Sequence, residues 1–209
     1  ISSTAVLEEG VANASTYVKC TGIFDKISPA AKCWIYPNAH GSLNVSGAIA
    51  VSCNFFFYQM GYNLGTVNGT YNSQRGLTKL KKYASMYGFN RKSGVEITEY
   101  EPHISDEDAI RSAIGQGTNN MTAISLARYV TALATDGKLY TFRLLSKICD
   151  ANGNVIEELT PEGEQIEGIS QSTYDVMREG MYRVVHAAGT AAGAFTGLQI
   201  DIAGKSGSV

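Results

Sequence analysis

The stretch Ala48-Ile49-Ala50-Val51-Ser52-Cys53-Asn54-Phe55-Phe56-Phe57-Tyr58 places a polar triplet between two apolar runs. A serine hydroxyl both donates and accepts hydrogen bonds, and an asparagine side chain carries a carbonyl and an amide. Ser52 and Asn54 could therefore pass a proton and hold a substrate amide. Both residue types also cap helices, and the triplet alone is better explained as a cap between two helices. The same Ser-x-Asn pattern recurs at Ser42-Leu43-Asn44.

A second polar element lies near the end of the chain, where Lys205-Ser206-Gly207 follows the alternating stretch Leu198-Gln199-Ile200-Asp201-Ile202. The alternation predicts a strand that carries a Lys-Ser-Gly edge. The letters Lys92-Ser93-Gly94 occur earlier, but they follow an amphipathic helix and turn residues rather than an alternating run. This context favours the later copy.

A Ser-x-Asn followed by a Lys-[Ser/Thr]-Gly resembles two of the three motifs of the penicillin-recognising serine enzymes, whose first motif is Ser-x-x-Lys. The whole chain is similar to the transpeptidase domain of class B penicillin-binding proteins. The matching segments, in family order, are Val6–Gly10, Lys32–Trp34 with His40-Gly41, Val51–Phe55, Gly61–Gly65, Ile114–Gly117, Gly180-Met181 and Ile202–Gly207. Two departures stand out: Ser206 replaces a more common threonine but keeps the hydroxyl, and no serine has a lysine three residues later.

In that family the helix of the nucleophile continues into a segment like Thr4–Gly10, so the resemblance places the Ser-x-x-Lys motif just upstream of Ile1. Family members also continue past the third motif with further strands and a closing helix. We therefore expect residues 1–209 to be a single-domain fragment, truncated at both ends. Its expected class is α+β, a fragment of the transpeptidase/β-lactamase-like fold that is mainly helical, with a β-hairpin and an incomplete antiparallel sheet.

The resemblance implies a peptidoglycan D,D-transpeptidase that attacks a D-Ala-D-Ala stem peptide, or a β-lactam, with the missing serine and forms an acyl-enzyme. Ser52 would relay a proton to the leaving nitrogen, and Asn54 would bind the substrate amide. Lys205 would hold Ser52 by a charge-assisted hydrogen bond. If these residues form one site, the Ser52 hydroxyl and the Lys205 ammonium group should lie roughly 2.6 to 3.2 Å apart.

The substrate-binding residues implied by the resemblance are Ser206, Gly207 and Ser208. The two serine hydroxyls would bind the terminal carboxylate, Gly207 would let substrate approach closely, and the Ser208 N–H would be an oxyanion donor. Serine β-lactamases and β-lactam sensor domains share these motifs, but Ile114–Gly117 and Gly180-Met181 favour a transpeptidase. A non-catalytic envelope protein, in which both motifs are only caps and turns, is a third interpretation.

Composition and net charge argue against some classes of binding partner. The chain has 209 residues, of which 44% are hydrophobic, enough for a sizeable core. Its net charge of -2 and pI near 5.9 provide no basic field, so no nucleic-acid partner is expected. No apolar run approaches the roughly 18 residues of a membrane span. The resemblance places the parent protein at the extracytoplasmic face of the bacterial membrane, held by an N-terminal anchor outside this chain, where the cell-wall synthesis machinery is a candidate partner.

The cysteines at positions 20, 33, 53 and 149 show no Cys-x-x-Cys or Cys/His spacing, which argues against zinc. No metal or other cofactor is expected. Cys20 and Cys33 could close a loop in an oxidising compartment, but two free, half-buried thiols are the better interpretation. Cys53 should point away from the cleft. The three histidines, His40, His103 and His186, show no ligand spacing and are interpreted as structural.

Hydrophobic periodicity, caps and glycines predict the remaining elements. One helix should end at Gly10, and another should carry the acidic residues of Ser105–Asp108 at its N-terminus. Further helices are expected at about 44–51, 55–64, 77–87, 122–135 and 170–186. Strands at 138–145 and 154–157 should flank a turn at 150–153, whereas 13–42, 66–75 and 187–197 are interpreted as an irregular segment, a polar loop and a flexible link.

Overall fold

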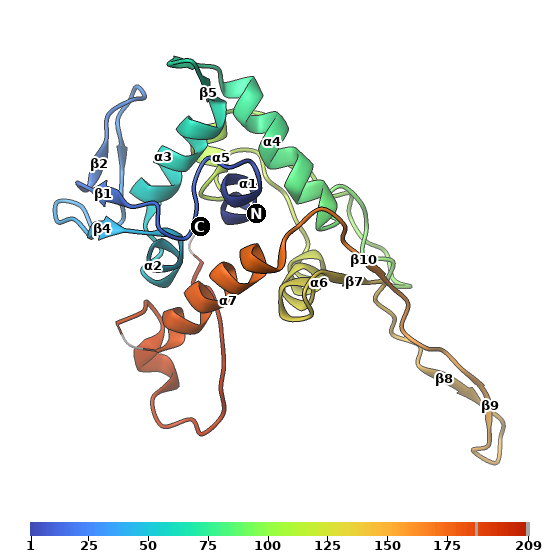
Figure 1. Cartoon of the computed structure of the whole chain (residues 1–209). Helices are drawn as coiled ribbons and strands as arrows, with labels where there is room; N and C mark the ends of the chain where they lie inside the picture. Colours follow the sequence, from blue (N-terminus) through green and yellow to red (C-terminus); the bar gives the residue numbers. More distant parts are fainter. Residues whose placement is uncertain (187, 208–209) are drawn as a thin grey trace.

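The computed structural model describes residues 1–186 and 188–207, in which helices surround a central first helix (Figure 1). The helices are α1 (Ser2–Glu8), α2 (Val45–Ala50), α3 (Asn54–Gly65), α4 (Ser73–Met86), α5 (Ala109–Ser112), α6 (Ala123–Ala134) and α7 (Gln171–Val185), with a 3-10 helix, η1, at Ala192–Phe195. The fully buried Ala5 and Val6 place α1 in the core, where it contacts α3, α4 and α7. None of the described helices is long and apolar enough to cross a membrane.

The strands that the structure describes form short antiparallel pairs rather than one large sheet. The pairs are β1 (Val18–Cys20) with β4 (Gly41–Leu43), β2 (Ile23–Phe24) with β3 (Ala31–Lys32), β5 (Thr66–Val67) with β6 (Thr70–Tyr71), β7 (Lys138–Tyr140) with β10 (Gly163–Gln165), and β8 (Lys147–Cys149) with β9 (Val155–Glu158). The predicted α+β class, mainly helical with antiparallel strand pairing, is confirmed.

The helix boundaries follow the capping signals in the sequence. The Asn44 side chain accepts a hydrogen bond from the Gly47 N–H at the start of α2, and Asn72 does the same for Arg75 in α4. Gly10, with a φ of 64°, follows α1 in the left-handed region that glycine tolerates. Caps of this kind satisfy backbone N–H groups that the first turn leaves free, so they fix where each helix begins.

Four predictions were wrong in detail. The segment 13–42 contains β1, β2 and β3, the segment 66–75 contains the β5–β6 hairpin, and the link 187–197, whose residue 187 lies outside the described residues, contains η1. Residues 198–202 form no strand. A strand needs a neighbour for its backbone hydrogen bonds, and here the Gly204 N–H instead donates to the Met181 carbonyl at 3.0 Å.

The buried face of α6 is not the one that apolar periodicity in residues 122–135 indicates. Ala127 and Val130 lie at helical spacing, but both are exposed. The buried side chains include Ser125 and Arg128, at 1% and 3% exposure. The helix is therefore rotated so that a charged residue packs inside the protein.

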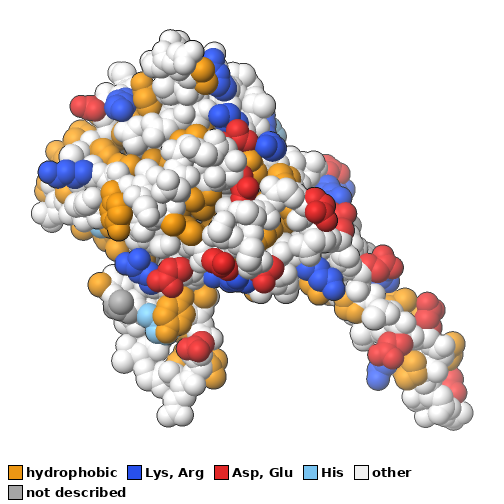
Figure 2. Space-filling model, in the orientation of Figure 1, with side chains coloured by type: hydrophobic (Ala, Val, Ile, Leu, Met, Phe, Trp, Pro, Cys, Tyr) orange, Lys and Arg blue, Asp and Glu red, His pale blue; other side chains and the backbone are white. Residues whose placement is uncertain are grey.

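The strands β7, β8, β9 and β10, within residues 138–165, form a long β arm that extends from the body of the molecule (Figure 1). Figure 2 shows it as a protrusion with hydrophobic and acidic side chains on its surface. The predicted turn at 150–153 is confirmed, because the Asp150 carboxylate accepts hydrogen bonds from the N–H groups of Asn152 and Asn154. The strand pairing differs from the prediction, because residues 138–140 pair with residues 163–165 and not with residues 154–157.

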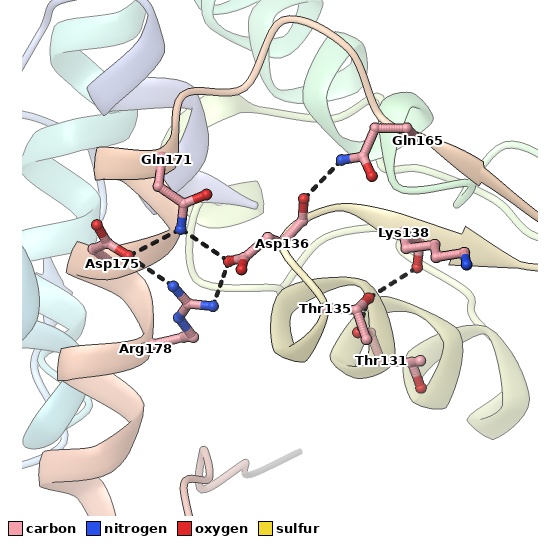
Figure 3. Close-up of polar contacts among 8 residues, drawn as sticks. All are labelled: Thr131, Thr135, Asp136, Lys138, Gln165, Gln171, Asp175 and Arg178. Carbon is pink, nitrogen blue, oxygen red and sulfur yellow. Dashed lines mark hydrogen bonds and ion pairs between the residues drawn. The ribbon is translucent and has the colours of Figure 1, made fainter.

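A polar network joins the base of this arm to α7 (Figure 3). Asp136, which follows α6, accepts hydrogen bonds from Arg178 and Gln171 of α7. Gln165 of β10 donates to the Asp136 carbonyl at 2.7 Å. Because one turn residue contacts both elements, the network holds the end of α6, the arm and α7 together.

Close packing of α7 on α2 gives a testable prediction. A Cβ atom added at Gly180 would lie 2.8 Å from Ile49 Cβ, nearer than two side chains can approach. Gly180→Val should therefore lower the free energy of unfolding by about 2 to 3 kcal/mol, as overpacking does in other cores. Urea denaturation measures the change. The control is Gly193→Val, where an added Cβ meets nothing within 4 Å; equal losses in both variants would contradict the packing argument.

Candidate active site

The turn between α2 and α3 positions Ser52 and Asn54. Ser52 has a φ of 51°, an uncommon left-handed conformation for a residue with a side chain. The cap of α3 is Cys53, whose sulfur accepts a hydrogen bond from the Phe56 N–H at 3.4 Å. The sequence suggested that the triplet caps a helix, and the residue that does so is Cys53. The side chains of Ser52 and Asn54 remain available to the cleft.

Lys205 lies beside Ser52 although 153 residues separate them in the sequence. The Lys205 ammonium group donates a hydrogen bond of 2.7 Å to Ser52 Oγ, which confirms the predicted distance. It also donates to the Ser206 carbonyl at 2.6 Å. Partial shielding from water lowers the pKa of Lys205, although much of the residue remains exposed. An ammonium group with a lowered pKa gives up a proton more readily than a free lysine does.

Two backbone contacts bring the end of the chain to this site. The Thr190 N–H donates to the Ala50 carbonyl at 3.1 Å, at the last residue of α2. The Gly204 N–H donates to the Met181 carbonyl on α7 at 3.0 Å. Because α2 and α7 pack against each other, both contacts place Lys205 at the end of α2, where Ser52 begins the turn.

A cavity of about 220 Å³ adjoins the polar pair. Ser52, Asn54 and Lys205 all line it, so Asn54 faces the same cleft as the other two. The apolar part of its wall includes Phe57, Ile114, Tyr129, Val130 and Met181. Residues far apart in the sequence therefore meet around one pocket, including Ile114 and Met181 from two of the segments that carry the family resemblance.

The structure does not bring the described residues among the expected substrate-binding set, Ser206 and Gly207, into the cavity. Ser206 Oγ lies 2.7 Å from the Thr190 hydroxyl, with which it shares a hydrogen bond. Gly207 is exposed, and a Cβ added there would meet nothing within 4 Å. Ser208 lies outside the described residues. Neither Ser206 nor Gly207 lines the cavity.

The second copies of the two motifs, at residues 42–44 and 92–94, lie away from the cavity. Asn44 is occupied as the cap of α2, and Ser42 is exposed on β4. Lys92 forms an ion pair with Glu101 at 2.8 Å. Ser93 is buried and donates to the Glu99 carboxylate at 2.8 Å. The contacts of Asn44, Lys92 and Ser93 are structural, and none of the four residues lines the cavity.

The cysteines depart most from the sequence prediction. No disulfide joins them, but Cys20, Cys33 and Cys53 are buried in one place beside His40. The expectation of no Cys/His cluster was wrong. The sulfurs of Cys33 and Cys53 share a hydrogen bond, which lowers the pKa of the Cys33 thiol against the opposing effect of burial. Cys53 does point away from the cleft, as predicted, because its sulfur lies in this cluster.

Comparison with known proteins identifies the family. The model of the penicillin binding protein transpeptidase domain matches residues 1–208. The chain is 28% identical over 207 residues to the peptidoglycan D,D-transpeptidase MrdA of Haemophilus influenzae, covering 84% of this chain and 29% of that protein. It is 26% identical over 223 residues to penicillin-binding protein 2B of Streptococcus pneumoniae, covering 96% of this chain and 32% of that protein. The chain belongs to the penicillin-binding protein transpeptidase family.

Solved structures agree on the fold. A structure of penicillin-binding protein 2B from Streptococcus pneumoniae strain R6 matches 100% of this chain and 37% of its own, with a TM-score of 0.83 and 21% identity. A structure of a peptidoglycan synthase complex matches 99% of this chain and 34% of its own, with a TM-score of 0.84 and 24% identity. The chain spans about a third of the length of the curated relatives that it matches.

Proposed function

We propose that this chain is the part of a class B peptidoglycan D,D-transpeptidase that carries the second and third motifs of the active site. The observation that supports this most strongly is the 2.7 Å hydrogen bond from Lys205 to Ser52, beside a cavity that Asn54 also lines. Residues 153 positions apart have no local reason to meet. Their contact brings together the polar groups that the family's acyl transfer requires.

The proposed reaction has two steps. The serine of the Ser-x-x-Lys motif, in the parent protein, attacks the carbonyl carbon between the two D-alanines; a C–O bond forms and the C–N bond breaks. The terminal D-alanine leaves with a proton on its nitrogen, which Ser52 relays. The amine of a second stem peptide then attacks the ester, forms the cross-link and returns the serine. With a β-lactam, the acyl-enzyme persists.

Each described polar group has a role in this proposal. Lys205 holds the Ser52 hydroxyl and makes the pocket positive, which favours a substrate that ends in a carboxylate. Asn54 binds the backbone amide of the stem peptide. Ser206 would bind the carboxylate after exchanging its Thr190 contact for one to substrate, and Gly207 leaves room beside it. Ser208, with its hydroxyl and its N–H, would complete the carboxylate and oxyanion contacts.

The relatives suggest where the parent works. The curated relatives are named as a peptidoglycan D,D-transpeptidase and a penicillin-binding protein. A solved relative from Helicobacter pylori is in complex with MreC. By analogy, the parent of this chain would act at the extracytoplasmic face of the membrane, held by an anchor outside residues 1–209, together with other proteins of cell-wall synthesis.

Mass spectrometry of the parent protein after incubation with penicillin tests the proposal. We expect a stable covalent adduct, and formation of a cross-linked product when a D-Ala-D-Ala donor and an amine acceptor are supplied. Residues 1–209 alone should stay unmodified, because they contain no Ser-x-x-Lys pair. Rapid hydrolysis of penicillin would indicate a β-lactamase, and an adduct without cross-linking would indicate a sensor. Absence of any adduct would favour a non-catalytic protein.

A further inference from the structure

The single tryptophan of the chain contacts the turn that presents Ser52. Trp34 lies in the loop between β3 and β4, and its indole N–H donates a hydrogen bond of 3.0 Å to the Val51 carbonyl. Val51 is the C-cap of α2 and immediately precedes Ser52. A side chain 17 positions earlier in the sequence therefore bonds to the backbone of the candidate active site.

The turn has a backbone conformation that needs external support. Ser52 has a φ of 51°, which is unfavourable for a residue with a Cβ atom. Such a conformation persists only where surrounding contacts enforce it. The Ser52 N–H donates to the Ile49 carbonyl at 3.1 Å, which fixes one side of the residue. Among the described residues, no backbone N–H contacts the Val51 carbonyl, so its hydrogen-bond partner is the indole of Trp34.

The loop that carries Trp34 is itself held in place. The Cys33 N–H donates to the Gly22 carbonyl at 2.9 Å, and the Tyr36 N–H donates to the Cys33 carbonyl at 3.0 Å. The Trp34 ring lies against the His40 ring, with centroids 5.2 Å apart. The indole N–H is therefore presented from a fixed position, and little conformational freedom is lost when it binds the carbonyl.

Burial of the ring does not explain why a tryptophan stands at this position. Trp34 is 56% exposed, so much of the apolar surface of its ring stays in contact with water. Its nitrogen, in contrast, is paired with a backbone carbonyl of the turn. Lys205 holds the Ser52 hydroxyl at 2.7 Å. The two contacts are complementary, because one fixes the hydroxyl and the other fixes the backbone that carries it.

We propose that Trp34 is a positioning residue for acyl transfer. Its indole N–H, bonded to the Val51 carbonyl, holds the turn so that the Ser52 hydroxyl meets both Lys205 and the leaving nitrogen of the substrate. Trp34 does not line the cavity, so it acts through the backbone and not by touching the reacting atoms. A displacement of about 1 Å at a reacting group can cost about 100-fold in rate. This role rests on the proposed function, whereas the hydrogen bond itself does not.

The first test separates binding from chemistry in the parent protein. Trp34→Phe keeps an aromatic ring but removes the N–H. We expect the maximal rate constant for acylation by a chromogenic β-lactam to fall by about 10- to 100-fold, while the dissociation constant of the initial non-covalent complex stays within about twofold. Tyr36→Phe, which removes a hydroxyl from the same loop, should change neither constant. An unchanged acylation step in Trp34→Phe, or a loss confined to the initial complex, would overturn the proposal.

A shape-matched side chain separates the N–H from the ring. In 3-benzothienylalanine a sulfur atom takes the place of the indole N–H, and the outline of the ring is kept. The parent protein with this side chain in place of Trp34 should be acylated as slowly as Trp34→Phe. A normal rate would show that the ring and not the hydrogen bond positions the turn, which would refute the assignment.

The indole N–H itself provides a test that needs neither substrate nor acylation. Because residues 1–209 contain one tryptophan, their nuclear magnetic resonance spectrum has one indole N–H signal. We expect this N–H to exchange with solvent more slowly than that of free tryptophan, although the ring is largely exposed. Exchange as fast as in free tryptophan, in a sample whose α3 amides stay protected, would contradict the hydrogen bond.

The outcomes distinguish this role from the transpeptidase function. If the unchanged parent protein forms no penicillin adduct, the proposed function fails and the role of Trp34 fails with it. If the unchanged parent and both Trp34 replacements are acylated at the same rate, the function stands and only the role of Trp34 is refuted.

Discussion

Replacing Ser52 with alanine in the parent protein should slow its acylation by penicillin by about 10²- to 10⁴-fold, the contribution typical of a positioned proton-transfer group. The hydroxyl that accepts the Lys205 hydrogen bond is the only group that this change removes. Without it, no hydroxyl group relays a proton to the leaving nitrogen, and the Lys205 ammonium group loses a hydrogen-bond acceptor. Stopped-flow measurement of acylation by a chromogenic β-lactam gives the rate.

Two further variants separate chemistry from folding. Ser42→Ala alters the other Ser-x-Asn pattern, which lies on β4 away from the cavity, and should acylate at the unchanged rate. Ser52→Gly removes the same hydroxyl but relieves the left-handed backbone, whose φ is 51°. It should therefore be at least as stable as the unchanged protein and yet acylate as slowly as Ser52→Ala. A normal acylation rate in Ser52→Gly would show that the hydroxyl is not needed.

The elements predicted correctly are those in which local patterns and packing agree. In α4, Leu77, Leu80 and Ala84 recur at helical spacing, and all three are buried. The pairing of Ser52 with Lys205 was also predicted, but it came from the resemblance to a family and not from any local pattern. Periodicity shows which face of an element is apolar, whereas contact between distant residues depends on the tertiary fold.

Three features could not be predicted, for related reasons. The apolar residue Val130 lies on the cavity wall. The apolar face of α6 at this point therefore lines the cavity and is not packed in the core. The alternating residues 198–202 lack a neighbouring strand among the described residues, and alternation without a partner forms no sheet. The cluster of Cys20, Cys33, His40 and Cys53 forms through the strand register and the start of α3. These residues are not closely spaced in the sequence, so no local motif reveals the cluster.

Arg128 is the residue whose replacement should destabilise the fold most. Its side chain is buried on α6 and donates hydrogen bonds to three backbone carbonyls of the loop after α4, at Gly88, Arg91 and Lys92. Burial lowers the pKa of Arg128. Arg128→Met keeps much of the volume but leaves these carbonyls without their donor. We expect the free energy of unfolding to fall by about 3 to 5 kcal/mol, because buried polar groups that lose charged partners are costly.

Urea denaturation of residues 1–209 measures this loss, and Arg183→Met is the matched control. Arg183 is exposed on α7, so its replacement should change stability by no more than about 0.5 kcal/mol. Because Arg128 ties α6 to the loop at residues 88–92, hydrogen exchange of that loop should quicken in Arg128→Met and stay unchanged in Arg183→Met. Equal stability of the two variants would mean that water replaces the arginine at the three carbonyls. The loop would then not depend on Arg128 for its position.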